Sequence, residues 1–334
     1  MGTIGSGYPN FLDIATQMDP NGDLAEAIDL ISEDNTVLED MVATESNDYM
    51  SHRSTGLISA PTGNWRMFND GVPDEKELYE QAVDPIGMLH TNLKIDVDLA
   101  AQAPSPARYR AQRTRVAMNG FGDTVSDAFF YANPGLPADI AKFRGLAPRY
   151  SATASTGAGN QIILSSVGTG SGSDCTSVYA VTPGETKTHF IYPRQSEAGL
   201  RVKDMKEQLV TGANGDFNAW VTQLKWHVGL VVEDYRDNAR LANIDLGDPA
   251  WSESVRKALT EEIILMLGRV RRRKMGKTVL YMNQTIIDQL SIHAQEKSNV
   301  NLMVQTFAGE PVLHCHGAPI RLQEAIKNTE PAIA

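Results

Sequence analysis

Polar and apolar residues alternate without a break near the middle of the chain. Between Trp220 and Val232, every second position carries a tryptophan, threonine, leucine or valine. Because successive side chains of a strand point to opposite faces of a sheet, this alternation predicts one long strand with a single buried face. At about 3.3 Å per residue the strand would be roughly 43 Å long, whereas most strands have about 3–10 residues. Such a strand favours a long, narrow sheet over a small barrel.

A long helix is predicted upstream of this strand. Pro104 and Pro106 precede residues 107–133, and the sequence Asn133-Pro134-Gly135 ends the helical pattern. At about 1.5 Å per residue the helix would be roughly 40 Å long. This length is close to that of the long strand, so we expect the helix to lie along the narrow sheet as the backbone of the subunit.

The region around the long strand predicts two hairpins. Val178 to Thr182 and Thr188 to Tyr192 are strand candidates that flank Pro183-Gly184, which predicts the first hairpin. Asn214-Gly215, just before the long strand, is a turn sequence of the kind that hairpins favour. This part of the chain is therefore expected to be rich in β structure.

The last 85 residues change to an alternating pattern of helices and strands. A helix is predicted to begin at Asp248-Pro249, which are a good cap and first-turn pair. A buried strand from Thr278 to Met282 and a second helix from Gln284 to Gln295 follow. Leu302 to Phe307 and Pro311 to His314 then predict a hairpin. The pattern indicates a second compact domain.

Residues 51–98 alternate short apolar runs with turn-forming sequences, which predicts a two-stranded ribbon. We place Trp65 and Phe68 at its base, against Met88, Leu89 and Leu93, and a charged tip at residues 74–80. A two-stranded ribbon is marginally stable alone in water, so an extended one is expected to lie on another chain. The alternative is a hairpin folded back on its own domain.

Charge is concentrated at the N-terminus. The net charge is −11, and residues 1–50 hold 11 of the 41 acidic residues but no lysine or arginine, so the other residues carry 30 acids against 30 bases. Like charges at this density favour an extended arm. Leu24, Ile28 and Ile31 recur at helical spacing and give the arm an apolar stripe, which a neighbouring subunit could cover. The alternative is an acidic helix packed on its own domain.

Candidate catalytic and metal-binding residues are sparse. The motifs G-x-S-x-G, H-E-x-x-H and G-x-x-x-x-G-K-[ST] are absent, and seven scattered histidines identify no general base. In a strand at His314-Cys315-His316, Cys315 would face away from both histidines, which disfavours a metal site. Cys175 and Cys315 lie 140 positions apart and are expected to be reduced core thiols. We therefore expect no catalytic, cofactor-binding or metal-binding residues.

One basic cluster follows the first helix of the C-terminal region. Its residues are Arg269, Arg271, Arg272, Arg273 and Lys274. Such a cluster could contact the phosphates of DNA. A subunit contact or a solvated loop is favoured, because no aromatic residues are interleaved and the whole chain is acidic. No apolar stretch approaches the roughly 20 residues of a membrane span, and no basic residue precedes an apolar run at the N-terminus, so we expect assembly in a cytoplasm.

Several short segments occur in a characteristic order. They are Ser51 to Val72 (S-H-R-S-T-G-L-I-S-A-P-T-G-N-W-R-M-F-N-D-G-V), Lys142 to Tyr150 (K-F-R-G-L-A-P-R-Y), His189 to Pro193, Trp226 to Arg236 (W-H-V-G-L-V-V-E-D-Y-R) and Arg240 to Asp245. These segments resemble the major capsid proteins of tailed bacteriophages, and the resemblance covers about residues 50–320. It implies an α+β fold of the Hong Kong 97 type.

That fold family implies four parts. They are an N-terminal arm (1–50), an extended loop formed by the β-ribbon (51–98), a peripheral domain with a spine helix at 107–133 and long strands (99–250), and an axial α/β domain (251–334). In the family a long peripheral strand returns after the axial domain, whereas here the long strand candidate precedes the axial-like region. We therefore expect a rearranged strand connectivity.

The resemblance also implies a function without catalysis. Subunits would self-assemble into hexamers and pentamers of an icosahedral shell that encloses double-stranded DNA without sequence-specific binding. A scaffolding protein and a portal are expected partners during assembly, a decoration or cement protein is a further candidate, and no membrane is involved. The expected contacts between subunits are Leu24, Ile28, Ile31, Trp65, Phe68, Lys76 and Tyr79. An encapsulin-like protein compartment is the alternative, and a soluble α/β enzyme is a more remote one.

Overall fold

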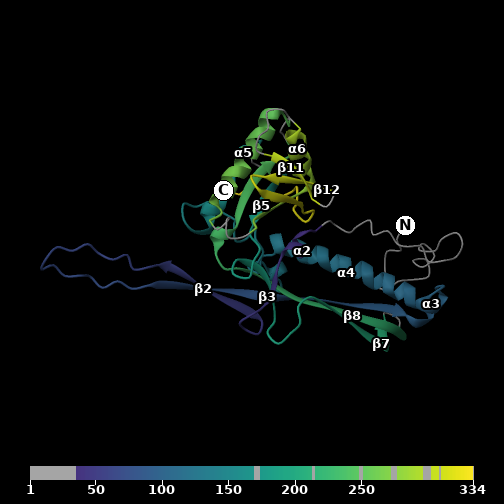
Figure 1. Ribbon diagram of the computed structural model, residues 1–334. Helices are drawn as coiled ribbons and strands as arrows, with labels where there is room; N and C mark the ends of the chain where they lie inside the picture. The colour runs from purple at the N-terminus through teal and green to yellow at the C-terminus, as the bar shows by residue number, and fades with distance from the viewer. Residues whose placement is uncertain are drawn as a thin grey trace.

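A computed structural model represents the 334-residue chain. It describes residues 35–168, 174–212, 215–247, 251–271, 277–295, 302–307 and 310–333. Figure 1 shows an elongated lower lobe, in which long strands run beside a long helix, and a compact upper lobe that rises from it. A thin ribbon of two strands projects sideways from the lower lobe, well beyond the rest of the molecule.

The lower lobe contains a six-stranded sheet built around the predicted long strand. In spatial order its strands are β1 (Ala43–Glu45), β6 (Thr188–Tyr192), β8 (Gly215–Val232), β3 (Leu78–Asp96) and β2 (Ser51–Ser59), and β7 (Leu200–Gly212) also pairs with β8. β8 contains the whole predicted strand. Leu224, Val228 and Leu230 on its predicted inner face are buried. The alternating pattern therefore predicted the strand correctly, but not a single buried face, because Ala219, Val221 and Val231 on its other face are buried as well.

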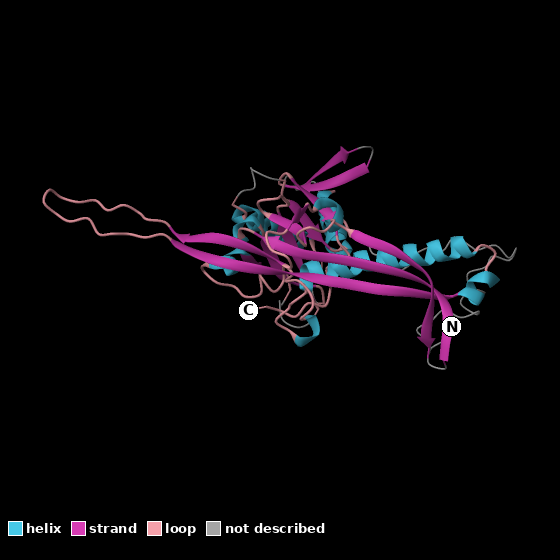
Figure 2. Cartoon of the chain, turned by 90° about the horizontal axis from the view of Figure 1, so that it is seen from below, coloured by secondary structure: helices cyan, strands magenta, loops and turns pink. Residues whose placement is uncertain are grey.

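The predicted long helix is α4 (Pro106–Tyr131), which follows the short helix α3 (Val97–Gln102). Near its start, Tyr109 is buried with Ile95 of β3 and the half-buried Trp220 of β8. Near its end, Phe129 and Phe130 enter the large core that joins the two lobes. Figure 2 shows α4 running beside the long strands. The helix prediction is confirmed to within two residues at each end.

The upper lobe contains a seven-stranded sheet covered by two helices. In spatial order its strands are β11 (Leu302–Phe307), β12 (Glu310–Cys315), β13 (Ala318–Leu322), β10 (Val279–Met282), β5 (Cys175–Val181), β9 (Ala239–Asp245) and β4 (Ile162–Leu164). Helix α5 (Glu253–Arg269) buries Leu259, Ile263 and Met266 against this sheet, and α6 (Gln284–Ala294) lies beside α5. The remaining helices are short: α2 (Val37–Asp40), η1 (Pro137–Asp139), η2 (Gly157–Gln161) and η3 (Tyr235–Asp237).

The strand, helix and hairpin predicted after residue 277 are confirmed as β10, α6 and the antiparallel pair β11–β12. The first helix begins later than predicted, at Glu253 with Ser252 as its N-cap residue. Asp248-Pro249, where we predicted its start, lies outside the described residues. Asn214 also lies outside them, but β7 and β8 do form an antiparallel hairpin across that position.

The hairpin predicted around Pro183-Gly184 is wrong. β5 and β6 belong to different sheets, with β5 in the upper lobe and β6 in the lower lobe. Asn238 connects the two strand ends, because its side-chain oxygen accepts hydrogen bonds from the Thr182 backbone N–H at 3.2 Å and from the Thr188 hydroxyl at 3.0 Å. The turn-forming residues therefore mark a crossing between lobes instead of a hairpin.

The domain boundary predicted at residue 250 does not coincide with the division between the sheets. β4, β5 and β9 precede that residue, yet they lie in the same sheet as β10–β13. Within the described residues the chain crosses between lobes three times, after α4, after β5 and after β8. A single boundary in the sequence cannot describe two sheets that exchange strands in this way.

Candidate assembly surfaces and the lobe junction

The ribbon (residues 51–85) is a hairpin that leaves the lower lobe and extends into solvent (Figure 1, Figure 2). β2 pairs with the first half of β3, from Ser51 opposite Pro85 to Ser59 opposite Leu78. The second half of β3, from Ile86 onward, pairs with β8 and so anchors the ribbon in the sheet. The predicted two-stranded ribbon is present, and it is not folded back on its own chain.

Trp65 and Phe68 lie in the tip of the ribbon (residues 60–77), not at its base as we predicted. Their relative exposures are 104% and 100%, so neither ring contacts the rest of the chain. The paired strands end at Ser59 and Leu78, which leaves all the turn-forming residues between them in one long loop. The ribbon therefore presents aromatic side chains to solvent at its far end.

Polar contacts organise this tip. Glu75 accepts hydrogen bonds from the Thr62 backbone N–H at 2.6 Å and from the Asn64 side chain at 2.7 Å, and these bonds lower the pKa of the Glu75 carboxyl. The Tyr79 hydroxyl donates to Glu77, which raises the pKa of Tyr79. Lys76 is exposed. The charged tip predicted at 74–80 is correct for residues 74–77, whereas residues 78–80 begin β3.

The predicted arm is attached to its own subunit over its last residues. Leu24, Ile28 and Ile31 lie outside the described residues. Val37 is fully buried in the core shared by the lobes, and its backbone N–H donates to the side chain of Gln323 at 3.1 Å. β1 then pairs with β6 in parallel. Any part of the arm that reaches a neighbour therefore lies before residue 35, and the arm does not extend to residue 50.

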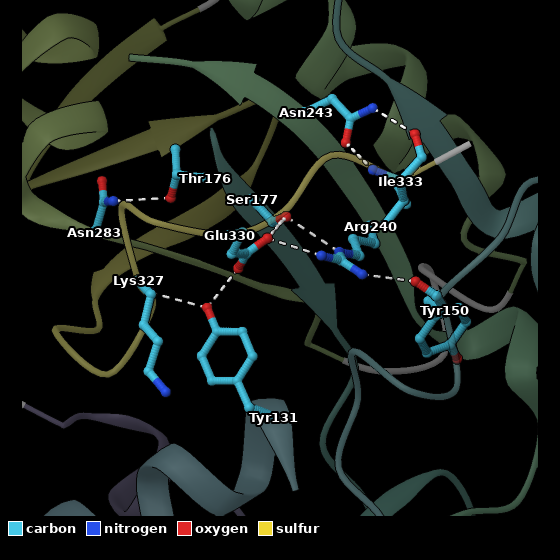
Figure 3. Close-up of polar contacts among 10 residues, drawn as sticks. All are labelled: Tyr131, Tyr150, Thr176, Ser177, Arg240, Asn243, Asn283, Lys327, Glu330 and Ile333. Atoms are coloured by element: carbon cyan, nitrogen blue, oxygen red, sulfur yellow. Dashed lines mark hydrogen bonds and ion pairs between the residues drawn. The ribbon is translucent and has the colours of Figure 1, made fainter. Parts of the chain in front are cut away.

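A buried polar network joins the two lobes beneath the upper sheet (Figure 3). Arg240 of β9 donates to Glu330 at 2.8 Å, to the carbonyl of Tyr150 at 2.8 Å and to the hydroxyl of Ser177 at 3.1 Å. Glu330 also accepts hydrogen bonds from Ser177 and from Tyr131, the last residue of α4. Residues from α4, two strands, the loop after α4 and the C-terminal tail thus meet at one ion pair.

The electrostatics of this junction suit a structural role. Burial, with the nearby Tyr179 and Glu330, raises the pKa of Tyr131, so its hydroxyl stays protonated and donates. Burial opposes the charge of Arg240, but Tyr179 and Glu330 hold the pKa of its guanidinium above the usual value. The two charged side chains are buried and already hold each other and their neighbours through hydrogen bonds. The network fixes the two lobes to each other.

Comparison with known protein families shows to which family the chain belongs. The model of one family, described as "Major capsid protein GP7", matches residues 19–334. The chain belongs to this family. It is the major capsid protein of a phage, and the virion is where it resides. The α+β fold, the resemblance in sequence and the family agree, so the capsid prediction is confirmed.

The match to bacteriophage Epsilon15 supports the fold assignment of this capsid protein. A chain in the structure of bacteriophage Epsilon15 matches with a TM-score of 0.77 and 26% identity, covering 100% of this chain and 99% of that chain. The capsid of bacteriophage JBD30 matches at a TM-score of 0.48 and 10% identity, over 89% and 92% of the two chains. The SrpI encapsulin of Synechococcus elongatus PCC 7942 matches at 0.46 and 9%, over 65% and 90%. None of the curated proteins compared with the chain matches it.

The fold of this capsid protein is therefore of the Hong Kong 97 type. The rearranged connectivity that we expected stays a prediction. No helix in the described ranges is long and apolar enough to cross a membrane.

The predicted basic cluster is only partly described. Arg269, in the last turn of α5, donates to the backbone carbonyls of Asn160 and Ile162, each at 2.6 Å. It borders an open hollow of about 560 Å³, and both of these hydrogen bonds use its Nη1 atom. Arg271 is exposed, and Arg272, Arg273 and Lys274 lie outside the described residues. The role of the cluster stays a prediction.

The two cysteines of the capsid protein are buried and free, as predicted, and burial raises the pKa of the Cys175 thiol. His316 lies in a turn with a positive φ of 48° and not in a strand, so the argument that it shares a face with His314 does not hold. Sequence reasoning missed the junction of Arg240 and Glu330, because these residues lie 90 positions apart and no local pattern pairs them.

Proposed function

We propose that this capsid protein self-assembles into hexamers and pentamers that close an icosahedral shell around double-stranded DNA, with the ribbon tip docked on a neighbouring subunit. The observation that carries the proposal is the complete exposure of Trp65 and Phe68. Large apolar groups that lie exposed close together commonly mark an interaction site. A ribbon of two strands also gains stability only by lying on another surface.

The size of the effect supports docking by the tip. Each aromatic ring can bury about 150–250 Å². At about 25 cal/mol per Å², covering both rings is worth roughly 8–12 kcal/mol before the cost of ordering the ribbon is subtracted. Each subunit would both donate and receive a tip, so it is held on several sides at once and cannot leave without breaking every contact.

The parts of the subunit take separate roles in this proposal. Residues before position 35 act as the arm, residues 51–98 include the extended loop, α4 and the six-stranded sheet form the peripheral domain, and the seven-stranded sheet with α5 and α6 forms the axial domain. Lys76 and Tyr79 accompany the aromatic residues at the contact. The arm residues Leu24, Ile28 and Ile31 add a second contact.

The partners follow from the same proposal. The net charge of −11 suits a container that encloses DNA without binding its phosphates tightly or by sequence. Assembly takes place in the host cytoplasm with a scaffolding protein and a portal, and a decoration or cement protein is a further candidate partner. The subunit is expected to catalyse no reaction.

Replacing the two aromatic residues of the tip tests the proposal. The double variant Trp65→Ser, Phe68→Ser should fold like the parent, because neither ring contacts its own chain. Assembly of this variant, followed by sedimentation and electron microscopy, should fail or require a much higher protein concentration. Asp74→Asn, an exposed change in the same loop, is the matched control and should assemble normally. Normal shells from the double variant would refute docking by the tip.

A further inference from the structure

Three potential metal ligands meet where the ribbon joins the lower lobe. His52 is on β2, His189 is on β6, and Glu233 follows the last residue of β8. One ligand atom from each of the three lies within 4.8 Å of the other two. His52 Nε2 is 3.2 Å from Glu233 Oε1, and the two imidazole rings are 5.9 Å apart in an edge-to-face arrangement. Within the described residues no other set of three histidine, cysteine or acidic side chains gathers in this way.

The buried ring of His189 is the feature of this cluster that points to a bound ligand. Its relative exposure is 1%, yet neither ring nitrogen makes a hydrogen bond of normal geometry to the described part of the chain. The backbone of Gly184 lies close enough to favour the protonated ring slightly, but burial outweighs it and lowers the pKa of His189 to about 4. Buried polar atoms in proteins are almost always satisfied, so two such nitrogens call for an explanation.

The surrounding charges also favour a cation. Glu233 contributes a carboxylate, and the buried Asp84 lies directly opposite His52 across the ribbon. Arg149 pairs with Asp84 through one carboxylate oxygen at 2.6 Å, whereas the other oxygen makes no hydrogen bond within the described residues. The guanidinium charge next to the cluster is thus balanced, and the carboxylate of Glu233 remains available to a cation.

We propose that His52, His189 and Glu233 bind one divalent transition-metal cation of the zinc type. Two imidazoles and one carboxylate are a known donor set for Zn²⁺, with metal–ligand distances of about 2.0–2.2 Å. Ligand atoms in such a site lie closer together than 4.8 Å, so rotation of the partly exposed His52 and Glu233 side chains has to close the cluster. A water molecule or a group from a neighbouring subunit completes the tetrahedron.

The position of the site gives the cation a mechanical role. Among the described strands β2 pairs only with β3, so the outer strand of the ribbon is not paired with β6 or β8, and His52 reaches Glu233 after β8 only through one side-chain contact. A cation held by residues from β2, β6 and the end of β8 would connect this outer strand to the body of the subunit. It would fix the direction in which the ribbon leaves the lower lobe. Binding of the cation itself does not depend on how the shell assembles.

Metal titration of the full-length protein tests the proposal. The protein is freed of metal with a chelator and titrated with Zn²⁺ alone by calorimetry, and with Co²⁺ alone by absorption spectroscopy, which reports tetrahedral coordination. We expect one saturable cation per subunit. His52→Gln and Glu233→Gln should each weaken binding by more than the about 10–100-fold that loss of an outer-shell partner costs. Both side chains are partly exposed, so the variants are expected to fold, and circular dichroism checks this.

A second histidine pair provides the matched control. The rings of His90 and His227 stack on the lower sheet with their Nε2 atoms 3.1 Å apart, which could bind Zn²⁺ adventitiously. The double variant His90→Gln, His227→Gln should therefore bind the cation as tightly as the parent does. Hydrogen exchange of β2 should slow on adding Zn²⁺ in the parent and in this control, but not in His52→Gln.

Three results would overturn the proposal. One is a parent protein that takes up no saturable cation. Another is a folded His52→Gln or Glu233→Gln variant that binds as the parent does. The third is binding that disappears in the control variant, because the cation would then occupy the exposed histidine pair.

Discussion

Removing the charge of Glu330 should destabilise the subunit strongly, because it leaves the buried guanidinium of Arg240 without a counterion. The two side chains are 4% and 5% exposed, and their nearest atoms are 2.8 Å apart. Glu330→Gln keeps the shape of the side chain and one acceptor oxygen for Tyr131 or Ser177. It cannot provide the negative charge that Arg240 needs.

The magnitude follows from the burial of the pair. Breaking a buried ion pair by removing one partner costs about 3–5 kcal/mol. The exposed pair Lys257–Glu261, whose charged atoms are 4.0 Å apart, gives a control. Glu261→Gln should change the free energy of unfolding by less than about 0.5 kcal/mol, because exposed ion pairs contribute little.

Urea unfolding of unassembled subunits, followed by circular dichroism, measures the difference. With a denaturant slope of about 3 kcal/mol per molar urea, Glu330→Gln should lower the unfolding midpoint by roughly 1 M or more. In a double-mutant cycle, Arg240→Met should cost less in the Glu330→Gln background than in the parent, since the stranded charge is then removed. A Glu330→Gln midpoint that coincides with that of Glu261→Gln would show that the junction does not hold the lobes together.

Three further outcomes are expected. A Cβ atom at Gly229 would lie 2.8 Å from the side chain of Ile191, so Gly229→Ala should lower the free energy of unfolding by about 1–3 kcal/mol. Gly120 lies in open space on α4, so Gly120→Ala should raise the free energy of unfolding by up to about 1 kcal/mol. Equal effects of the two variants in thermal unfolding would contradict this reasoning. Burial, and after it the neighbouring His90, lower the pKa of His227 from 6.5, so the unfolded chain binds the proton more readily than the folded chain. The free energy of unfolding should therefore fall as the pH drops through 6.5, by less than about 1 kcal/mol because the ring is partly exposed. His227→Gln should remove this loss when urea midpoints are measured from pH 7 to 5. Deleting residues 1–34 should leave a folded subunit that assembles poorly in sedimentation assays, and normal shells would show that the arm is dispensable.

Elements with long, regular patterns could be predicted from the sequence. β8 carries an unbroken alternation of polar and apolar residues, and α4 is bounded by proline and by Asn-Pro-Gly, so each pattern fits one kind of structure. Leu259, Ile263 and Met266 of α5 also recur at helical spacing, and all three are buried. In these elements the buried face depends on spacing along the chain, which is visible without knowledge of the partner surface.

Features that depend on distant pairing could not be predicted. Pro183-Gly184 has the composition of a hairpin turn, but only the separate sheets show that β5 and β6 diverge there. Trp65 and Phe68 lie at the tip of the ribbon and not at its base, and nothing in the local sequence fixes where β2 and β3 stop pairing. The cluster of His52, His189 and Glu233 forms only where three strands converge, so no local spacing in the sequence predicts it.

A cryo-electron microscopy map of particles assembled from the purified protein tests the central claim most directly. The account predicts closed shells made of hexamers and pentamers, with the rings of Trp65 and Phe68 buried against a neighbouring subunit. Small discrete oligomers, or shells in which both rings remain exposed to solvent, would contradict it.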